Sequence, residues 1–510
     1  MGNTGKPSRA CATCKKRKIK CDQLTPACSQ CKKAGWVCPG VPSEADINFR
    51  NQTSIVRKNT TQGRSTLARG MSSKSNSALG ARTRSLSPPA IDRATSFFIH
   101  QYVLILESGS SSASLRGNHE YLPGLLQNEH SASGVLNTVI AAAGLAAMSN
   151  AGSVLAWRSE AFRLYGKAIR QLQDVLQDPI QRKSDQTLAA VMLMGTFETI
   201  ASADITSMKT FSHHTIAAAR CIEMRGPDQF HSEASLKLFY QMRRIIVMTC
   251  HQLQEPIPHA LTRWSRWAEY LHSNDLAPAN RFTEINERLA GVRAEIKHQD
   301  IRDPAIVAAR LLPIDELFES WAQTLPPSWT YKSYRYIGPN GVPSSRYDLQ
   351  YDTYPDTWVA CLWNSYRNVR LLIHESIMAA TLKYGTDEQK ANLHRSAKVL
   401  VNMANGICHS AAYLLGYRRH DGNAEDARKF EGLENVPTPG GGFLLLWPLF
   451  FSGMLRTTPK EQRQWVAKKI HRMAVQMGLQ LAMSMAKLLE EKALSFSHSD
   501  TFFLGEWHPN

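Results

Sequence analysis

The sequence is poor in acidic residues and contains no long uninterrupted apolar run. Its 510 residues include 43 Asp or Glu against 60 Lys or Arg, which gives a formal net charge of +17. Residues 1–96 hold 18 Lys or Arg and only four Asp or Glu, so most of the surplus lies in the N-terminal fifth. A concentrated basic segment predicts a polyanionic partner, either nucleic acid or an anionic membrane surface.

Signals for export and for membrane insertion are also missing. The N-terminus, MGNTGKPSRACATCKKRK, has no apolar core of a secretory signal. The longest strongly apolar run, from Phe443 to Leu455, is interrupted by Pro448 and falls short of the ~20 residues that a spanning helix needs. The Ala-rich stretch 135–157 predicts a pair of buried helices. We therefore expect a soluble intracellular protein in a reducing compartment.

Common catalytic motifs are absent as well. The sequence contains no HExxH, GxSxG, GxGxxG or GxxxxGK[ST], which mark metalloprotease, hydrolase, dinucleotide and phosphate sites. The pair His213-His214 lies on a predicted helix and is more typical of structural or exposed histidines than of a metal site. The glycines at 440–442 lack a following Lys and predict a loop. We expect no enzymatic activity. The remaining cysteines, Cys221, Cys250, Cys361 and Cys408, are expected to be buried and to pack as small hydrophobic residues.

Cysteines are concentrated near the N-terminus. Six of the ten fall between positions 11 and 38: Cys11, Cys14, Cys21, Cys28, Cys31 and Cys38. The spacing is one unit, C-x2-C-x6-C, written twice, and each C-x2-C pair can clamp one metal from a single turn. Six thiolates give two tetrahedral zinc ions four ligands each only if two of them bridge. The internal symmetry indicates the first cysteine of each half as the bridging pair.

Three alternatives to a zinc site fit the six cysteines less well. A disulfide framework requires an oxidising compartment. A metallothionein-like scavenger needs neither the two-fold spacing nor a large attached domain, and a redox CxxC site normally lies in a βαβ pattern. A segment of fewer than ~40 residues with few apolar side chains needs a staple to fold. We therefore expect metal binding to supply its folding energy.

Basic residues are interleaved with these cysteines. We expect DNA contacts from Lys15, Lys16, Arg17, Lys18 and Lys20 in the first half and from Lys32 and Lys33 in the second. A short helix leaving Cys14 would present the first group to the major groove, where Lys or Arg can reach guanine O6 and N7. The remaining side chains would contact phosphates. The run KKRKIK also fits a nuclear localisation signal, which is compatible with DNA binding.

The segment ACATCKKRKIKCDQLTPACSQCKKAGWVC resembles the fungal Zn2Cys6 binuclear-cluster DNA-binding domain. The resemblance implies that Cys11 and Cys28 bridge two zinc ions, that Cys14 and Cys21 complete one ion, and that Cys31 and Cys38 complete the other. It also implies that the first helix reads a CGG-type triplet through Lys18, with Arg17 close beside it. Many members of the family dimerise through a coiled coil after this domain, but residues 41–63 contain no sustained heptad. Dimerisation therefore stays open.

The rest of the chain divides into a linker and a helical region. Residues 46–92 are basic and rich in Ser and Thr, which predicts a disordered linker. Helical periodicity runs from Trp157 to Leu176, and Asp185 is expected to cap the buried helix that follows. A capping-box pattern at Thr458-Pro459-Lys460-Glu461 opens one long helix that ends near Lys492. We expect a mainly α fold with domains at 1–45, 46–92 and 93–510.

Stretches such as EYLPGLLQ and FLLLWPLFFSGM in residues 93–510 resemble the fungal-specific transcription factor regulatory domain. Together the two resemblances imply a nuclear, zinc-dependent, sequence-specific regulator of RNA polymerase II transcription that contacts the transcription machinery or coactivators. Regulators of this architecture often control metabolic or secondary-metabolite genes. The alternative is a nuclear scaffold or co-regulator with only nonspecific DNA binding. The aromatic tail 498–510 is a candidate activation element, although docking on the helical core is the favoured interpretation.

Overall fold

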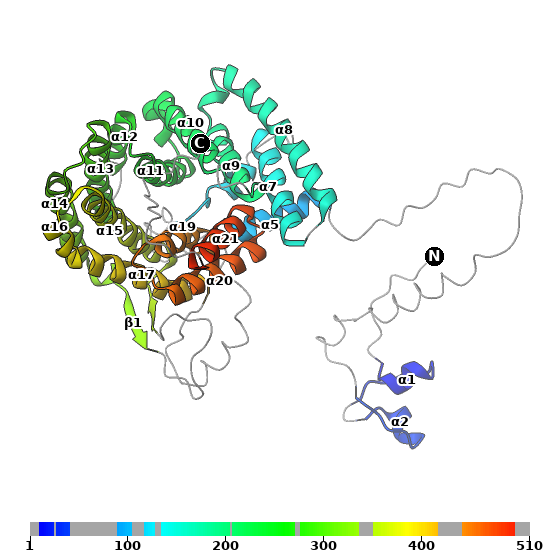
Figure 1. Ribbon diagram of the computed structural model, residues 1–510. Helices are drawn as coiled ribbons and strands as arrows, with labels where there is room; N and C mark the ends of the chain where they lie inside the picture. The colour runs from blue at the N-terminus through cyan, green and yellow to red at the C-terminus, as the bar shows by residue number, and fades with distance from the viewer. Residues whose placement is uncertain are drawn as a thin grey trace, which may run out of the picture. The chain divides into compact units, whose positions relative to one another are not determined.

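The computed structural model describes residues 10–24, 27–40, 89–104, 117–127, 134–152, 154–203, 207–270, 276–335, 350–416 and 441–494. The chain divides into two compact units, Met1–Arg84 and Ser85–Asn510. Nearly all of the linker predicted at 46–92 and all of the tail 498–510 lie outside the described residues. What is described consists of a small N-terminal cysteine cluster and a large helical unit (Figure 1), which confirms the mainly α fold.

The small unit is built from two similar halves. Helix α1 (Ala12–Lys16) and helix α2 (Ser29–Lys33) each begin directly after the first cysteine of their half, Cys11 and Cys28. Each helix is followed by a residue with left-handed backbone, Lys18 with φ 55° and Gly35 with φ 65°. The two halves therefore have matching backbone turns, although only the second half has glycine at this position.

Helices make up most of the large unit. Their bounds are α5 (Ala90–Tyr102), α6 (Leu122–Gln127), α7 (Val135–Gly152), α8 (Leu155–Gln177), α9 (Asp185–Ala201), α10 (Ser207–Arg225), α11 (Glu233–Leu253), α12 (His259–Tyr270), α13 (Ala277–His298), α14 (Pro304–Gln323), α15 (Thr357–Tyr384), α16 (Asp387–Ala391), α17 (His394–Leu414), α19 (Gly441–Met454), α20 (Lys460–Met477) and α21 (Gln480–Leu494). Helix α8 confirms the helix predicted from Trp157 to Leu176. The side chain that caps α9 is Ser184, not Asp185, which occupies the first helical position.

Short segments complete the large unit. Among its described residues, 3-10 turns lie at Gln181–Lys183, Gly226–Phe230 and Pro327–Trp329. Two strands that the sequence patterns did not predict, β1 (Lys332–Arg335) and β2 (Gln350–Thr353), pair antiparallel with Lys332 opposite Thr353. They lie beside α17 and form the one sheet of the described residues.

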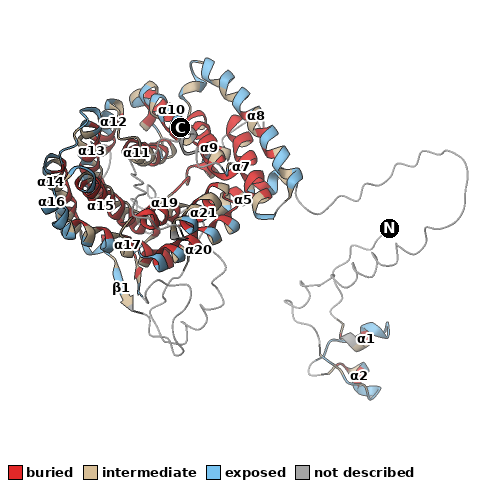
Figure 2. Ribbon diagram, viewed as in Figure 1, coloured by how far each residue is buried: buried red, intermediate tan, exposed pale blue. Residues whose placement is uncertain are grey.

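The core is centred on helices α7 and α9. Figure 2 shows both almost entirely buried, whereas α8 has a long exposed face. Helix α7 is long and apolar enough to cross a membrane by length and composition alone, and 72% of that stretch is buried within the unit. A helix that is apolar on all sides is typical of a protein core, and α7 packs against α5, α8 and α9.

The C-terminal helices close the same core as the N-terminal ones. The prediction of one long helix to Lys492 is wrong, because Gly478 takes φ 70° and ends α20 before α21 begins. A Cβ at Gly478 would lie 2.0 Å from the carbonyl oxygen of Ala147 in α7. Tyr102 Oη donates to the Met477 carbonyl at 2.6 Å, and Asn150 Nδ2 donates to that of Gly478 at 2.8 Å.

Two further expectations are corrected in the C-terminal helices. Thr458 does not cap α20, whose N-cap is Pro459, because the Thr458 hydroxyl donates to the Ser452 carbonyl at 2.5 Å. Gly441 and the glycine after it begin α19 instead of forming a loop. A Cβ on Gly441 would lie 2.3 Å from the carbonyl oxygen of Leu414, so a close backbone approach requires glycine there.

Candidate metal centre and nucleic-acid interface

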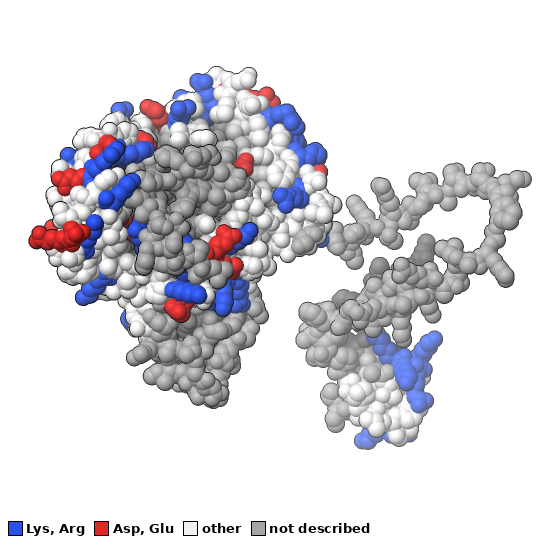
Figure 3. Space-filling model, in the orientation of Figure 1, with Lys and Arg blue, Asp and Glu red and all other residues white. Residues whose placement is uncertain are grey.

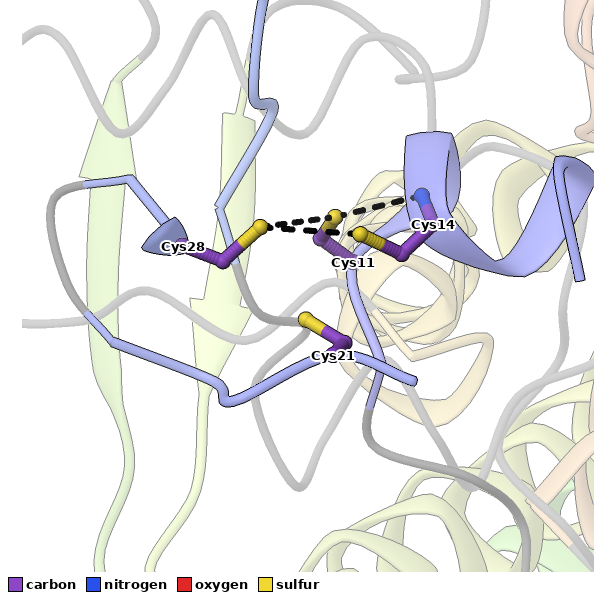
Figure 4. Close-up of side chains that lie close together, drawn as sticks. All are labelled: Cys11, Cys14, Cys21 and Cys28. Carbon is purple, nitrogen blue, oxygen red and sulfur yellow. Dashed lines mark hydrogen bonds between the residues drawn. The ribbon is translucent and has the colours of Figure 1, made fainter. Parts of the chain in front are cut away.

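The six clustered cysteines form two overlapping groups of four thiols. Cys11, Cys14, Cys21 and Cys28 make up one group, and Cys11, Cys28, Cys31 and Cys38 make up the other. Within each group all Sγ atoms lie within 4.8 Å of one another. Figure 4 shows the four sulfurs of the first group turned toward a common space from separate segments of the chain. Only Cys11 and Cys28 belong to both groups, as a bridged pair of ions requires.

The sulfur separations match metal coordination. The Sγ of Cys28 lies 3.8 Å from that of Cys11 and 3.6 Å from that of Cys14. Four sulfurs at the usual zinc–sulfur distance of ~2.3 Å around a tetrahedral ion lie about 3.8 Å apart, whereas a disulfide needs ~2.05 Å. None of the six cysteines is in a disulfide, and four of them are fully buried. The donor set and its spacing therefore fit zinc.

The protonation of these thiols depends on burial and on backbone donors. Burial raises the pKa of Cys14 well above the usual thiol range and raises the pKa of Cys31 to about 12. Backbone N–H groups, including that of Cys28 at 3.5 Å, lower the pKa of Cys38 to about 7. Because a thiol must lose its proton to bind a metal, occupation of this site releases protons.

Three contacts join the two halves of the small unit. Thr13 Oγ1 in α1 donates to the Val37 carbonyl at 3.0 Å. The carboxylate of Asp22 accepts from the backbone N–H of Ser29 at 3.1 Å and also contacts the Ser29 hydroxyl. The Arg17 guanidinium lies 3.9 Å from the centre of the Trp36 ring, a cation–π distance. The sequence analysis missed all three, although Asp22 stands out as the one acid between positions 9 and 43.

The seven predicted DNA-contacting residues are all exposed on the small unit: Lys15, Lys16, Arg17, Lys18, Lys20, Lys32 and Lys33. Figure 3 shows most of the basic side chains of this unit in one group, with others at its opposite end. The expected helix leaving Cys14 is placed differently, because α1 begins at Ala12, contains Cys14 and ends at Lys16. Lys18 therefore follows the helix instead of lying within it.

Arg17 and Lys18 have different surroundings. Arg17 is stacked on Trp36, whereas no side-chain hydrogen bond, ion pair or ring contact in the described part of the chain involves Lys18. The turn at Lys18 is fixed by two backbone bonds, from its own N–H to the Lys15 carbonyl at 3.3 Å and from the Ile19 N–H to the Cys14 carbonyl at 3.1 Å. These two backbone hydrogen bonds together form a Schellman motif.

The large unit holds an arrangement that resembles a catalytic triad. Ser396 Oγ lies 3.1 Å from His374 Nδ1, and His374 Nε2 lies 3.0 Å from Asp315 Oδ2. All three are buried, with 7%, 0% and 1% of their surface exposed. A nucleophile must reach its substrate, but these three side chains are buried, and none of them lines the cavity between α11, α13 and α15 or the one between α12 and α13.

The same group is instead the centre of a buried ion network. Both oxygens of Asp315 accept from Arg370 at 2.7 Å. Burial alone would raise the pKa of Asp315, but the hydrogen bonds from His374 and Arg370 outweigh it and lower the pKa to about 2. The network joins α14 to α15 and α17. Sequence analysis could not find it because its members are far apart in the chain, from Asp315 to Ser396.

The other residues considered for chemistry are not brought together. His213 is exposed and His214 is half-buried on α10. Within the described residues, the cysteine cluster supplies the groups of three or more metal-ligating side chains. Cys221, Cys250 and Cys408 are buried, Cys361 is half-buried, and none of them is in a disulfide.

Comparison with known proteins adds two family matches. The sequence model of the fungal Zn(2)-Cys(6) binuclear cluster domain matches residues 9–44, and that of the fungal specific transcription factor domain matches residues 95–323. A Saccharomyces cerevisiae protein described as an uncharacterized transcriptional regulatory protein is 58% identical over 33 residues, which are 6% of this chain and 4% of that protein. The chain thus matches only a small part of this relative's length. No solved structure matches the chain.

Proposed function

Because the chain belongs to the fungal Zn(2)-Cys(6) transcription regulators, we propose that it binds specific DNA sequences in the nucleus and regulates genes transcribed by RNA polymerase II. The observation that carries the proposal is the pair of overlapping four-thiol groups beside seven exposed basic residues. The large helical unit would contact the transcription machinery or coactivators. Its role is regulatory and not enzymatic, and metabolic or secondary-metabolite genes are its proposed targets.

Two zinc ions per chain would be held by the six clustered cysteines. Cys11 and Cys28 would bridge the ions, Cys14 and Cys21 would complete one, and Cys31 and Cys38 would complete the other. Zinc would neutralise the thiolates and supply the folding energy that so small a unit lacks. The chain itself would hold the two halves in register through the Asp22–Ser29 and Arg17–Trp36 contacts.

The first half of the cluster would read DNA. Lys18 would donate to guanine O6 and N7 of a CGG-type triplet in the major groove, with Arg17 held close beside it on Trp36. Phosphate contacts would come from Lys15, Lys16, Lys20, Lys32 and Lys33, and these carry the salt-dependent part of the affinity. The exposure of all seven side chains supports DNA contacts from this unit, and the division between base and phosphate contacts rests on the family resemblance of the sequence.

The experiment that tests the proposal is selection of duplexes from a random pool by the full, zinc-loaded chain, followed by binding at several salt concentrations. We expect enrichment of CGG-type triplets and a specific affinity at least ~10³-fold above that for scrambled duplex. Zinc removal with a chelator is the matched control and should abolish both. Recovery of duplexes without any shared sequence would contradict the proposal.

A second candidate function is a nuclear scaffold or co-regulator with only nonspecific DNA affinity. It is favoured by the size of the helical unit, which covers Ser85–Asn510 and is far larger than the cysteine cluster. For this function the affinity should fall with salt equally for all duplexes. The selection experiment therefore separates the two candidates.

A further inference from the structure

A cavity of about 110 Å³ lies between α11, α13 and α15 of the helical unit. Figure 1 shows these three helices in the green to yellow half of this unit. Each helix contributes residues three or four positions apart, for example Lys237, Gln241 and Arg244 from α11. Side chains at this spacing share one face of a helix, so three helix faces converge on the cavity. Sites between helices of a bundle are common places for small ligands.

The lining combines apolar surface with positive charge. Its apolar part includes the rings of Phe282 and Trp358, and its charged part consists of Lys237, Arg243 and Arg244. No Asp or Glu lines it. A molecule with an apolar body and one negative charge complements both features, whereas a cation would be repelled.

Arg243 is a buried member of this lining, and one of its guanidinium nitrogens has no close acceptor. Only 5% of the residue is exposed, and its Nη1 makes no hydrogen bond. Nη1 lies 3.6 Å from a carboxylate oxygen of Glu269 in α12, and Nη2 donates to Asn280 Oδ1 at the long distance of 3.3 Å. Buried Arg370, by contrast, holds both oxygens of Asp315 at 2.7 Å. Leaving buried guanidinium N–H groups without a close acceptor is costly.

The neighbouring Arg244 is held in a similar way. Its Nη2 donates to Asn118 Oδ1 at 3.3 Å, a neutral acceptor at long range. Two adjacent arginines at one cavity, both with distant acceptors, form a receptor for a carboxylate, because guanidinium groups bind carboxylates through paired N–H donors.

We propose that this cavity binds a small organic monocarboxylate, with its carboxylate on Arg243 and Arg244 and its apolar body against Phe282 and Trp358. The cavity of about 110 Å³ limits the apolar body to no more than one ring, since an apolar cavity of ~150 Å³ holds benzene. The site is separate from the cysteine cluster, so the proposal does not depend on the DNA-binding function.

The test uses benzoate and the full chain. Benzoate carries one ring and one carboxylate, benzamide is its neutral counterpart, and acetate has the charge without the ring. We expect benzoate to raise the unfolding temperature saturably and to bind in calorimetry with a Kd on the order of 1 mM, a reasonable affinity for nine non-hydrogen atoms. Benzamide and acetate should each bind at least about tenfold more weakly, because each loses one of the two complementary features.

Three variants assign the effect to the cavity. Arg243→Gln should abolish the benzoate shift, and Arg288→Gln, an exposed arginine of α13 outside this cavity, should leave it intact. Should Arg243→Gln fail to fold, Leu362→Trp fills the cavity without removing a charge and should also abolish binding. Absence of a saturable benzoate effect, equal effects of benzoate and benzamide, or full binding by Leu362→Trp would each overturn the proposal.

Discussion

Replacing Lys18 with glycine should separate the folding of the cysteine cluster from its reading of DNA. Lys18 has a φ of 55°, and the equivalent residue in the second half is Gly35 with φ 65°. Left-handed backbone costs a residue with a side chain roughly 1–2 kcal/mol, and glycine loses about 0.5–1 kcal/mol more backbone entropy on folding. Lys18→Gly should therefore stabilise the folded cluster by up to about 1 kcal/mol.

The two readouts of this variant should move in opposite directions. Zinc binding and folding are coupled here, so a more stable folded cluster should bind zinc more tightly. In a chelator competition we expect a zinc affinity between that of the original chain and about fivefold tighter. Loss of the ammonium should weaken binding to the specific duplex by about 1–3 kcal/mol. Binding to a scrambled duplex should weaken much less. Both are measurable on the same zinc-loaded full chain.

Two controls isolate the causes. Lys18→Ala removes the ammonium but keeps a residue with a Cβ at the left-handed position. Its zinc affinity should stay near that of the original chain, while its DNA specificity should fall as much as in Lys18→Gly. Gly35→Ala places a Cβ where nothing lies within 4 Å, so no clash acts. Left-handed strain, offset in part by the backbone entropy that glycine loses on folding, should weaken zinc binding by up to about 1 kcal/mol. If Lys18→Gly weakened zinc binding, or lost the same affinity for specific and scrambled duplex, the reasoning on Lys18 would be refuted.

The other predictions concern the metal, the phosphate contacts and the helical core. Residues 1–45 made alone should be unfolded without metal and should hold two zinc ions by native mass spectrometry; Cys28→Ala should damage both sites, and a single ion in the unaltered fragment would contradict bridging. Lys32→Ala should weaken binding to all duplexes about equally and lower the salt slope by about one, which binding isotherms at several salt concentrations would check. Gly478→Ala should lower the free energy of unfolding by at least about 2 kcal/mol in thermal melts, because its Cβ would collide with the Ala147 carbonyl. Gly166→Ala, at a half-buried position of α8 where a Cβ would meet only the end of the Arg170 side chain at 3.9 Å, should be neutral or stabilising in the same melts. Asp315→Asn should cost up to about 3 kcal/mol, because buried Arg370 loses its paired charged hydrogen bonds to Asp315 but keeps the ion pair with Glu319 at 2.6 Å. Since the pKa of Asp315 is lowered to about 2 in the folded protein, its stabilisation should be present above the ordinary carboxyl pKa of ~3.9 and lost as the pH falls toward 2, and unfolding curves at several pH values should show no such loss in the variant.

The cysteine cluster was accessible to sequence analysis because its information is local. Six ligands at fixed spacing, all between Cys11 and Cys38, determine which thiols can meet. Even there the end of α1 was misplaced, because Lys18 adopts a turn that usually signals itself by a glycine, as Gly35 does in the second half.

The helical unit shows where such local information ends. Periodicity located α8 to within two residues at its start, but the break at Gly478 and the start of α19 at Gly441 depend on carbonyl groups of distant helices. The same holds for the network of Asp315, His374 and Ser396, whose members meet only once α14, α15 and α17 have packed. The cavity between α11, α13 and α15 likewise comes from three helix faces that no single segment reveals.

The closure of the core by the last helices decides how deletion experiments on this protein can be read. The regulatory-domain match ends at residue 323, yet Tyr102 of α5 and Asn150 of α7 are bonded to the α20–α21 turn at Met477 and Gly478. A truncation that removes α20 and α21 therefore uncovers parts of α7 and α9 and should yield misfolded protein. Loss of reporter output in such a truncation would measure proteolysis and not the removal of an activating segment. Cuts beyond α21 leave this closure intact, so a loss of reporter output there would indicate an activating segment.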